Sequence, residues 1–548
     1  MDYLQNLFVE NTFLSIVVGT FVSEDLTYIL SLTMHQTGRL SAGQFVFAFT
    51  VGALLGDFFL YFMGRISHRS LWLQKKISDF SFFKNLHNRH ASTEASIDRF
   101  LILTRFIPGS RIPTYFLAGL IKYSLFKFTA ILGAAAIIYC VCGILITSFA
   151  THLFSNFESL IFRLCVSVTA FFLTSLVFKM INFVMANRRD LKSALQVQYY
   201  EIFKLQYPEF WPHIVFYLPL YFYFVYLLTR YGLRSFMFAN PGIAYSGLIG
   251  ESKFEIEQKL NQIAPENSLK SFLLVGSEPG MTRNSMYRGQ FNKLNLNYPI
   301  ILKPNYGQKG RGVFLAKTEQ EALKYIEENL FDVLVQEHCP FENEMSIYYI
   351  KRPKDSRGQI FSATHKIFPT VSGDGQKTLK DLVTAHPYYR WQSGVYFRRF
   401  IDRWNSAVPN GEVVQLVKSG NHAQGAVFKN GRFLLTEPLT NFICDISERY
   451  NGFYIGRYDI RYASQDDLLS LKNIKIIELN GAGGESTDVY DSSYNYFKIV
   501  GVLFRQWEAV FAIGAQNVKI SKPKLSLIRF LIDLYKYTSM FKKYPIAN

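Results

Sequence analysis

Long uncharged apolar segments before about residue 231 constrain this chain more than any other feature. Five of them lie at roughly 14–34, 45–63, 100–120, 126–150 and 160–184, and those near twenty residues long can cross a bilayer core of about 30 Å. After residue 231 the composition becomes an ordinary mixture of polar and apolar residues. With 548 residues the chain has room for two or more domains. The sequence therefore predicts an α-helical membrane domain with re-entrant helices over residues 1–190, followed by a soluble α+β part.

The net charge of +17 points to lipid rather than nucleic acid as a partner. Much of the excess lies beside apolar segments, in the basic loops 65–99 and 187–192, and no aromatic and basic nucleic-acid motif accompanies it. The order of the segments puts both loops on one side, which the positive-inside tendency makes cytoplasmic. Five scattered cysteines without metal-ligand spacing argue against a disulfide framework or a zinc site.

Two of the apolar segments are interrupted. The first contains Glu24 and Asp25, and the third has a Pro-Gly stretch between Arg105 and Arg111. Asp57 in the second segment adds a further carboxylate. Charges at membrane depth are costly, and the backbone groups that proline frees must be satisfied away from lipid. We expect a polar cavity lined by Glu24, Asp57, Arg105 and Arg111. The alternative is that the carboxylates merely pair with the arginines and hold helices together.

These positions carry a resemblance. Residues 10–185 resemble the DedA (SNARE-associated, VTT-domain) family in Glu24, in Gly56-Asp57 with Tyr61 and Gly64, and in Arg105 with Pro108-Gly109 and Arg111. Thr104 stands where that family often has an aromatic residue or glycine. The resemblance implies a bacterial inner-membrane protein that moves phospholipid or a lipid-phosphate carrier such as undecaprenyl phosphate, coupled to protons or the membrane potential. Guanidinium groups can hold a phosphate, and carboxylates can compete for them or carry protons.

The segment 191–234 connects this domain to the soluble part. Its stretch 213–231 is rich in tyrosine and has basic residues on both sides, a composition typical of the membrane interface. We expect a re-entrant hairpin or an interfacial helix here, since a full span would carry the rest of the chain away from cytoplasmic ATP. The basic, aromatic tail 521–548 either rests on the membrane or is a solvated helix.

Strand and helix patterns alternate in residues 235–520. Strands are predicted at 271–275, 299–302, 333–336 and 345–350, with a helix at 318–328. The segment 250–253 opens a polar helix, and it either holds an anion or is an ordinary helix cap.

Two further strands are predicted at 453–461 and 474–479. If they pair, Asp459, Glu478 and Asn480 meet beside Arg457, because side chains two apart on a strand share a face. Two carboxylates and an amide oxygen make a pocket suited to Mg²⁺. The alternative is an edge hairpin with solvated charges.

A glycine-rich basic loop follows the predicted strand at 299–302. Lys303 precedes it, and its glycines and cations suit phosphate, although the Gly-Lys-Ser/Thr of a Walker A motif is absent. The residues expected to form this phosphate site are Lys303, Gly307, Gln308, Lys309, Gly310, Arg311 and Gly312.

Taken in order, this soluble part resembles the ATP-grasp superfamily over residues 235–515, particularly the carboxylate–amine ligases such as D-alanine–D-alanine ligase, cyanophycin synthetase and the ribosomal-protein glutamate ligase. The resemblance rests on a lysine strand, a glycine loop, the acids Glu337 and Glu344, and the later Asp459 and Glu478-x-Asn480. It implies ATP with Mg²⁺, or Mn²⁺ in its place. Residues 481–487 depart from the Asn-x-x-Pro-Gly turn common in those ligases, so the substrate stays open.

The resemblance also implies roles for single residues. Lys303 and Lys366 would contact phosphates, and the 307–312 loop would close over the γ-phosphate. Glu337 would lie at adenine and Glu344 at the ribose. The residues implied in catalysis are Arg457, Lys309 and Arg311, and those implied in metal binding are Asp459, Glu478 and Asn480.

The activity implied is a membrane-bound ligase that phosphorylates a carboxylate and joins the acyl phosphate to an amine, with an amino acid among the candidate substrates. The alternative is a DedA-type lipid transporter with a regulatory ATP-binding domain. The oligomeric state does not follow from the sequence.

Overall fold

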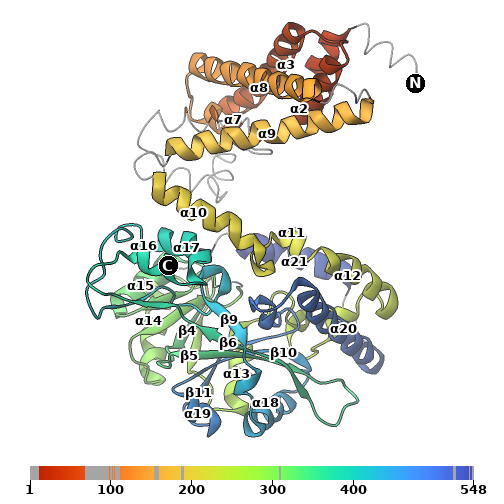
Figure 1. Ribbon diagram of the computed structural model, residues 1–548. Coiled ribbons are helices and arrows are strands. Elements are labelled where there is room, and N and C mark those ends of the chain that lie inside the picture. Colours follow the sequence, from red (N-terminus) through yellow and green to blue (C-terminus); the bar gives the residue numbers. More distant parts are fainter. Residues whose placement is uncertain are drawn as a thin grey trace. The chain divides into compact units, whose positions relative to one another are not determined.

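The computed structural model describes residues 11–67, 111–153, 159–186, 191–307, 310–521, 526–541 and 544–545, with single positions at 98, 101, 102 and 104. The chain divides into two compact units, Met1–Ala194 and Leu195–Asn548. Figure 1 shows the first in red to yellow and the second in yellow to blue.

The first unit is built from helices. Three of its described helices, α2 (Thr12–Gln36), α3 (Ala42–Ser67) and α8 (Leu125–Leu153), are long and apolar enough to cross a membrane by length and composition. They correspond to three of the five predicted apolar segments. The first unit also contains the helices α7 (Arg111–Leu120) and α9 (Leu160–Ala186). Most of the predicted basic loop 65–99 lies outside the described residues. Arg105 also lies outside them.

The predicted interruption of the first segment is present. Ser23 has φ −158° and ψ 105°, so α2 consists of two helical pieces that meet immediately before Glu24. The helices α3 and α7 pack closely at Gly64. A Cβ atom at this position would lie only 1.9 Å from the carbonyl oxygen of Phe116. Gly64 therefore has a packing role that explains a glycine there.

The second unit contains antiparallel sheets with helices around them. Its central sheet has five strands in the order β11 (Ile474–Asn480), β10 (Ile455–Tyr462), β5 (Asn343–Ile350), β6 (Gln359–Ile367) and β9 (Val427–Asn430). A second sheet has the order β1 (Ser271–Leu274), β4 (Val333–Glu337), β2 (Ile300–Pro304) and β3 (Phe314–Ala316). A two-stranded sheet pairs β7 (Thr370–Ser372) with β8 (Val413–Gln415). This arrangement confirms the predicted α+β fold of the soluble part.

The predicted local elements are present with small shifts at their ends. The predicted helix 318–328 is α15 (Glu319–Glu328), and Thr318 caps it by accepting a hydrogen bond from the Glu321 amide at 3.3 Å. The strands β3, β6, β7, β8 and β9 were not predicted from the sequence.

One face of the five-stranded sheet forms the main core of this unit. Apolar residues such as Ile347, Tyr458 and Ile476 pack there against α13 (Lys253–Ile263) and α18 (Glu437–Arg449). Side chains alternate along β10, and a register shift between β10 and β11 puts Glu478 on the face opposite to Ile476. The opposite face therefore carries the polar residues of the candidate site. Four further helices of this unit are α14 (Gly280–Lys293), α16 (Leu379–Ala385), α17 (Ser393–Arg399) and α19 (Gln465–Leu469).

The aromatic connector folds as α10 (Leu191–Phe203), α11 (His213–Phe216) and α12 (Leu218–Tyr231). The 14 residues of α12 extend about 21 Å, less than the hydrocarbon core of a bilayer. Within the second unit, α12 packs along α20 (Tyr496–Ser521), with the rings of Tyr223 and Phe504 stacked at 3.9 Å. The tail forms α21 (Leu527–Phe541).

Asn240 provides a direct test of this fold. Its side chain is fully buried, donates to the Ile455 carbonyl at 2.7 Å and accepts from the Tyr454 and Ile455 amides at 2.8 and 2.9 Å. Asn240→Ala leaves these backbone groups unsatisfied, so we expect a loss of about 2–4 kcal/mol in the free energy of unfolding. Thermal unfolding checks this, with Asn292→Ala on the exposed face of α14 as the control. Equal melting temperatures for the two variants would contradict the assignment.

Candidate active site

The polar face of the five-stranded sheet brings the predicted metal-site residues together. Asp459 on β10 lies opposite Glu478 on β11, and Arg457 lies opposite Asn480. On the other side of β10, Asp459 lies opposite Ser346 of β5. The predicted strand pairing is confirmed.

Asp459 is buried between two cations. Lys366 Nζ lies 3.0 Å from Oδ1 and Arg457 Nη2 lies 3.0 Å from Oδ2, while the Ser346 hydroxyl and the Asn480 amide also donate to the carboxylate. Burial opposes ionisation, but Arg457 and Lys366 outweigh it and hold the pKa of Asp459 well below its ordinary value. The group is therefore a carboxylate at neutral pH.

Glu478 is held ionised in the same way from another element. Its carboxylate pairs with Lys253, the first residue of α13. Burial would raise its pKa, but the charges of Lys253 and Lys303 lower it to about 2. Ser252 caps α13 by accepting from the Glu255 amide at 3.2 Å, which agrees with the helix-cap alternative for this segment.

The four-stranded sheet adds a third positive group. Lys303 on β2 lies 3.1 Å from Glu257 Oε1 and 3.0 Å from Gln336 Oε1 on β4. The charge of Lys303 also acts on Glu478, so groups from both sheets share one electrostatic environment. The helix α13, which bears Lys253 and Glu257, connects them.

Glu344 and Lys366 extend this cluster along the sheet. Glu344 accepts from Lys366 Nζ at 2.8 Å and from Arg461 Nε at 3.0 Å, and both Glu344 and Lys366 are buried. The charges thus alternate from Arg461 through Glu344, Lys366 and Asp459 to Arg457. Removing one member would leave a buried charge without its partner.

Two acids of the cluster keep oxygen atoms without a protein partner. Oε2 of Glu251 and Oε2 of Glu257 are buried and accept no hydrogen bond. Such atoms are rare in native structures and are typical of a site that holds a ligand or water. Burial raises the pKa of Glu251 to about 7, although Lys253 opposes the shift.

The donor set fits a magnesium–polyphosphate ligand. Among the residues the structure describes, no group of three or more His, Cys, Asp and Glu residues could hold a metal by itself. Mg²⁺ commonly takes one or two carboxylates and completes its shell with phosphate and water, which matches Asp459, Glu478 and the amide of Asn480. The cations Lys253 and Lys303 nearby would offset the phosphate charge.

The other predicted nucleotide residues have different surroundings. Gly310 and Gly312 both have φ +71°, a conformation that favours glycine. Arg311 Nη1 donates to the Phe541 carbonyl at 3.4 Å, and Glu337 accepts from the Lys270 amide at 3.2 Å. Gly307 follows β2, whereas Gln308 and Lys309 lie outside the described residues. Their roles stay predictions.

Several residues of the site were missed from the sequence. Lys253 is on α13, more than 200 residues from its partner Glu478, and Glu257 on the same helix pairs with Lys303 of β2. No local sequence pattern predicts either contact. Ser346 could have been found, because it lies two residues after Glu344 on the same strand face.

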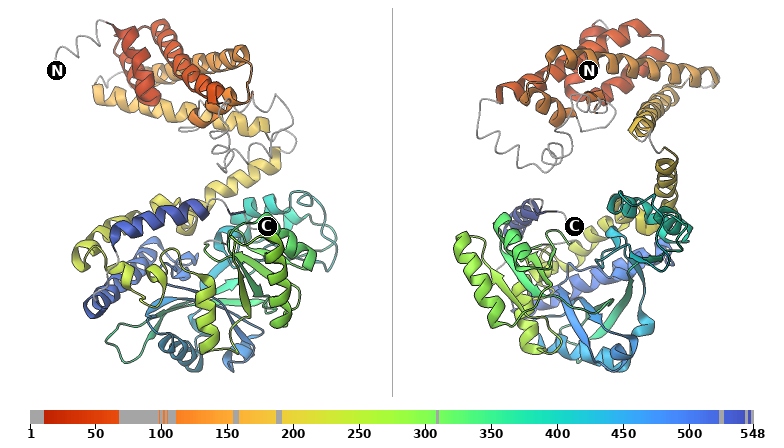
Figure 2. Two further views of the ribbon diagram at one scale, coloured as in Figure 1. Left: turned by 180° about the vertical axis from the view of Figure 1, so that it is seen from behind. Right: turned by 90° about the vertical axis from the view of Figure 1, so that its left-hand side faces the viewer.

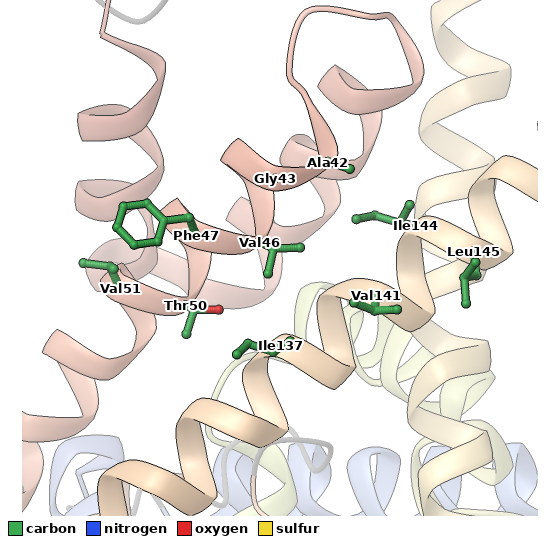
Figure 3. A pocket seen from close by; sticks show the side chains of 10 residues that line it. All are labelled: Ala42, Gly43, Val46, Phe47, Thr50, Val51, Ile137, Val141, Ile144 and Leu145. Atoms are coloured by element: carbon green, nitrogen blue, oxygen red, sulfur yellow. The ribbon is translucent and has the colours of Figure 1, made fainter.

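In the first unit, Arg111 forms ion pairs with Glu24 and, at 3.2 Å, with Asp25. This observation agrees with the pairing alternative, while Asp57 is buried and Arg105 lies outside the described residues. A hollow of about 510 Å³ lies between α3 and α8, with Val46, Val141 and their mostly apolar neighbours around it (Figure 3). Its lining suits hydrocarbon rather than phosphate.

Comparisons with known proteins agree with the nucleotide site. Residues 281–351, which contain Lys303, the glycine loop, Glu337 and Glu344, match the model of the RimK-like ATP-grasp domain. Together with the α+β topology, this match confirms the predicted ATP-grasp fold of the second unit. A comparison with curated proteins finds no significant match.

Several solved structures are similar to part of the chain. A bifunctional glutathione synthetase from Pasteurella multocida is 14% identical with a TM-score of 0.30, over 48% of this chain and 38% of that one. The D-alanine–D-alanine ligase from Coxiella burnetii is 9% identical with a TM-score of 0.28, over 54% and 64%. The VanG D-Ala:D-Ser ligase from Enterococcus faecalis is 12% identical with a TM-score of 0.27, over 48% and 64%. The chain thus spans less than two thirds of the length of each of these three structures.

Glu251 gives the site a pH dependence. Its folded pKa of about 7 lies above the ordinary 4.5, so the folded state binds the proton more tightly and loses stability as pH rises between these values. Glu251→Gln cannot ionise and so removes this loss. Relative to the parent protein, we expect the free energy of unfolding of the variant to rise by about 1–3 kcal/mol between about pH 5 and about pH 8.

Melting temperatures across this pH range measure the effect. The exposed Glu342→Gln serves as the control, for which the difference from the parent protein should stay constant. A constant difference for Glu251→Gln as well would show that Glu251 is not buried in this environment.

Proposed function

We propose that this chain, whose second unit has an ATP-grasp fold, is a membrane-bound ATP-dependent carboxylate–amine ligase. One observation carries the proposal: Asp459 and Glu478 face each other on β10 and β11 as ionised carboxylates, surrounded by four cations. Asp459 contacts Lys366 and Arg457, Glu478 contacts Lys253, and the charge of Lys303 reaches Glu478. The RimK-like match over residues 281–351 supports ATP as the phosphoryl donor.

In the proposed reaction a substrate carboxylate takes the γ-phosphoryl group of ATP, giving an acyl phosphate and ADP. The amine of the second substrate then attacks the acyl carbon, and inorganic phosphate leaves. Asp459, Glu478 and Asn480 would hold Mg²⁺, or Mn²⁺, which when bound offsets charge on the phosphate oxygens.

The protein's own residues supply positioning and electrostatic stabilisation. Lys303 and Lys366 bind the phosphates, and Arg457 stabilises the phosphoryl group during transfer. The 307–312 loop, with Lys309 and Arg311, closes over the γ-phosphate and excludes water from the acyl phosphate. Glu337 contacts adenine, and Glu344 contacts the ribose.

The metal-site assignment predicts a loss of turnover. Asp459→Asn and Glu478→Gln keep size and hydrogen-bonding capacity but remove a ligand charge, so we expect ATP turnover to fall at least about 100-fold. Release of ADP and phosphate in the presence of amino acids and lipid-linked acceptors measures this, and Asp466→Asn, exposed on α19, is the matched control. Turnover at the control's level in either site variant would refute the assignment.

We further propose that the first unit is a DedA-like domain that handles a lipid or lipid-linked substrate. Support comes from its helices and from Arg111, which pairs with Glu24 and Asp25 and can exchange them for a phosphate. Asp57 and Arg105 complete the proposed site. This assignment places the chain in a bacterial inner membrane, with the ATP-grasp unit in the cytoplasm where ATP is available.

The same arginine favours a second candidate function, a lipid transporter whose ATP-grasp unit only senses nucleotide. The two functions differ in one reconstituted assay that follows both flipping of a fluorescent phosphate-headgroup lipid and release of ADP. Arg111→Gln should reduce flipping at least about tenfold in either case, because the phosphate loses its guanidinium partner.

For the ligase, ADP release from soluble substrates should persist in Arg111→Gln. The exposed Arg39→Gln is the control for both measurements. Nucleotide binding without ADP release under every substrate mixture would favour the transporter and contradict the ligase.

A further inference from the structure

The outer face of α11 and α12 exposes apolar side chains at helical spacing. Ile214, Leu218, Phe222 and Val225 are 72%, 47%, 71% and 61% exposed. The inner face of the same segment is buried, with Leu227 fully covered. A helix that is apolar on both faces is expected to contact a second apolar environment in addition to the protein core.

The tail helix α21 repeats this pattern. Ile528, Leu531, Ile532 and Tyr535 follow the spacing of one helix face and are 53% to 78% exposed. On the opposite side, Phe530 is buried.

These two helices, some 300 residues apart in sequence, lie close together in the second unit. Phe224 of α12 and Phe530 of α21 both pack on Phe236, with ring centroids 6.1 and 5.5 Å away. Figures 1 and 2 show α12 and α21 side by side at one end of this unit. Both helices thus pack on Phe236 with the faces opposite their exposed stripes, and we name the two stripes together the docking face.

Most of the charges around the docking face are positive. Arg230 lies in the last turn of α12 and Arg234 follows that helix, while Arg529 and Lys536 are exposed on α21. The one carboxylate that contacts α12 from α20, Glu508, accepts hydrogen bonds from Tyr223 and Tyr231. The sequence of α11 and α12 contains no acid, and the one acid of α21, Asp533, is buried and paired with Arg529 at 3.0 Å. An apolar stripe bordered by cations matches the headgroup region of an anionic bilayer.

We propose that the catalytic unit lies on an anionic lipid bilayer through the docking face. The same chain has helices that are long and apolar enough to cross a membrane by length and composition, which favours a bilayer as the occupant. A second protein would be expected to match the cations with acids, whereas anionic lipid matches both the charge and the continuous apolar stripe. The inference does not depend on the ligase reaction.

The docking face is connected to the candidate active site. Tyr217, between α11 and α12, donates to Glu485 Oε1 at 2.9 Å, and the backbone carbonyl of Glu485 accepts from Arg457 Nη1 at 2.9 Å. Glu485 belongs to the turn where the sequence departs from the amino-acid ligases. Docking therefore places this turn close to lipid headgroups.

Photocrosslinking of the full chain identifies what covers the docking face. The benzophenone amino acid p-benzoylphenylalanine replaces Phe222 on α12, Tyr535 on α21, or Phe433, which is exposed to a similar extent (67%) and lies between β9 and α18. Each variant is reconstituted in vesicles of phosphatidylcholine and phosphatidylglycerol, irradiated and analysed by mass spectrometry. A melting temperature equal to that of the parent protein shows that each variant keeps the fold.

We expect lipid adducts at positions 222 and 535 in at least about fivefold excess over position 433, since only the first two lie in the bilayer interface. Vesicles of phosphatidylcholine alone should lower the yield at both positions. Crosslinks to a second copy or to another segment of the chain, or lipid adducts equal to those at position 433, would overturn the proposal. An unchanged yield without phosphatidylglycerol would overturn its electrostatic part.

Discussion

The buried ion pairs of Asp459 with Arg457 and Lys366 are the interaction on which the rest of the second unit depends. Four strands contribute partners to this carboxylate: Arg457 from β10, Lys366 from β6, Ser346 from β5 and Asn480 from β11. Each of the charged groups would be costly to bury alone. The alternation of charges from Arg461 to Arg457 fixes the register of β5, β6 and β10 on the polar face. An ordered, ionised carboxylate results, which is what a metal–phosphate site requires.

A cluster of this kind gains little stability from its ion pairs and is better suited to binding. Charged pairs in a protein interior lose much of their attraction to desolvation. Here the candidate site offers both cations, which suit phosphate, and the unpartnered carboxylate oxygens of Glu251 and Glu257. Polyphosphate and a divalent cation together would satisfy both.

Much of this site could be predicted because its core is local. Alternation along β10 and β11 places Arg457, Asp459, Glu478 and Asn480 on one face, and polar residues between the strands suggest that they pair. The partner strand β6, which carries Lys366, and the lysine of α13 could not be placed in this way. Their contacts with Asp459 and Glu478 depend on how distant elements fold together, and composition and periodicity do not report this.

The prediction of membrane segments was also limited to properties that are local in the sequence. Hydropathy indicates spans, but it does not show which faces of the connector helices stay uncovered. That α12 and α21 share Phe236 as a packing partner follows only from the tertiary fold. The most aromatic part of the sequence thus proves to have one face in the core of the catalytic unit and one face exposed.

The central claim is that Asp459 and Glu478 hold a metal ion for a nucleotide. Calorimetric titration of the full-length protein with a non-hydrolysable ATP analogue, with and without Mg²⁺, tests it most directly. The account predicts binding that is strengthened at least about tenfold by Mg²⁺ in the parent protein and is insensitive to Mg²⁺ in Asp459→Asn. Equal Mg²⁺ dependence in both proteins, or no nucleotide binding by the parent, would contradict it.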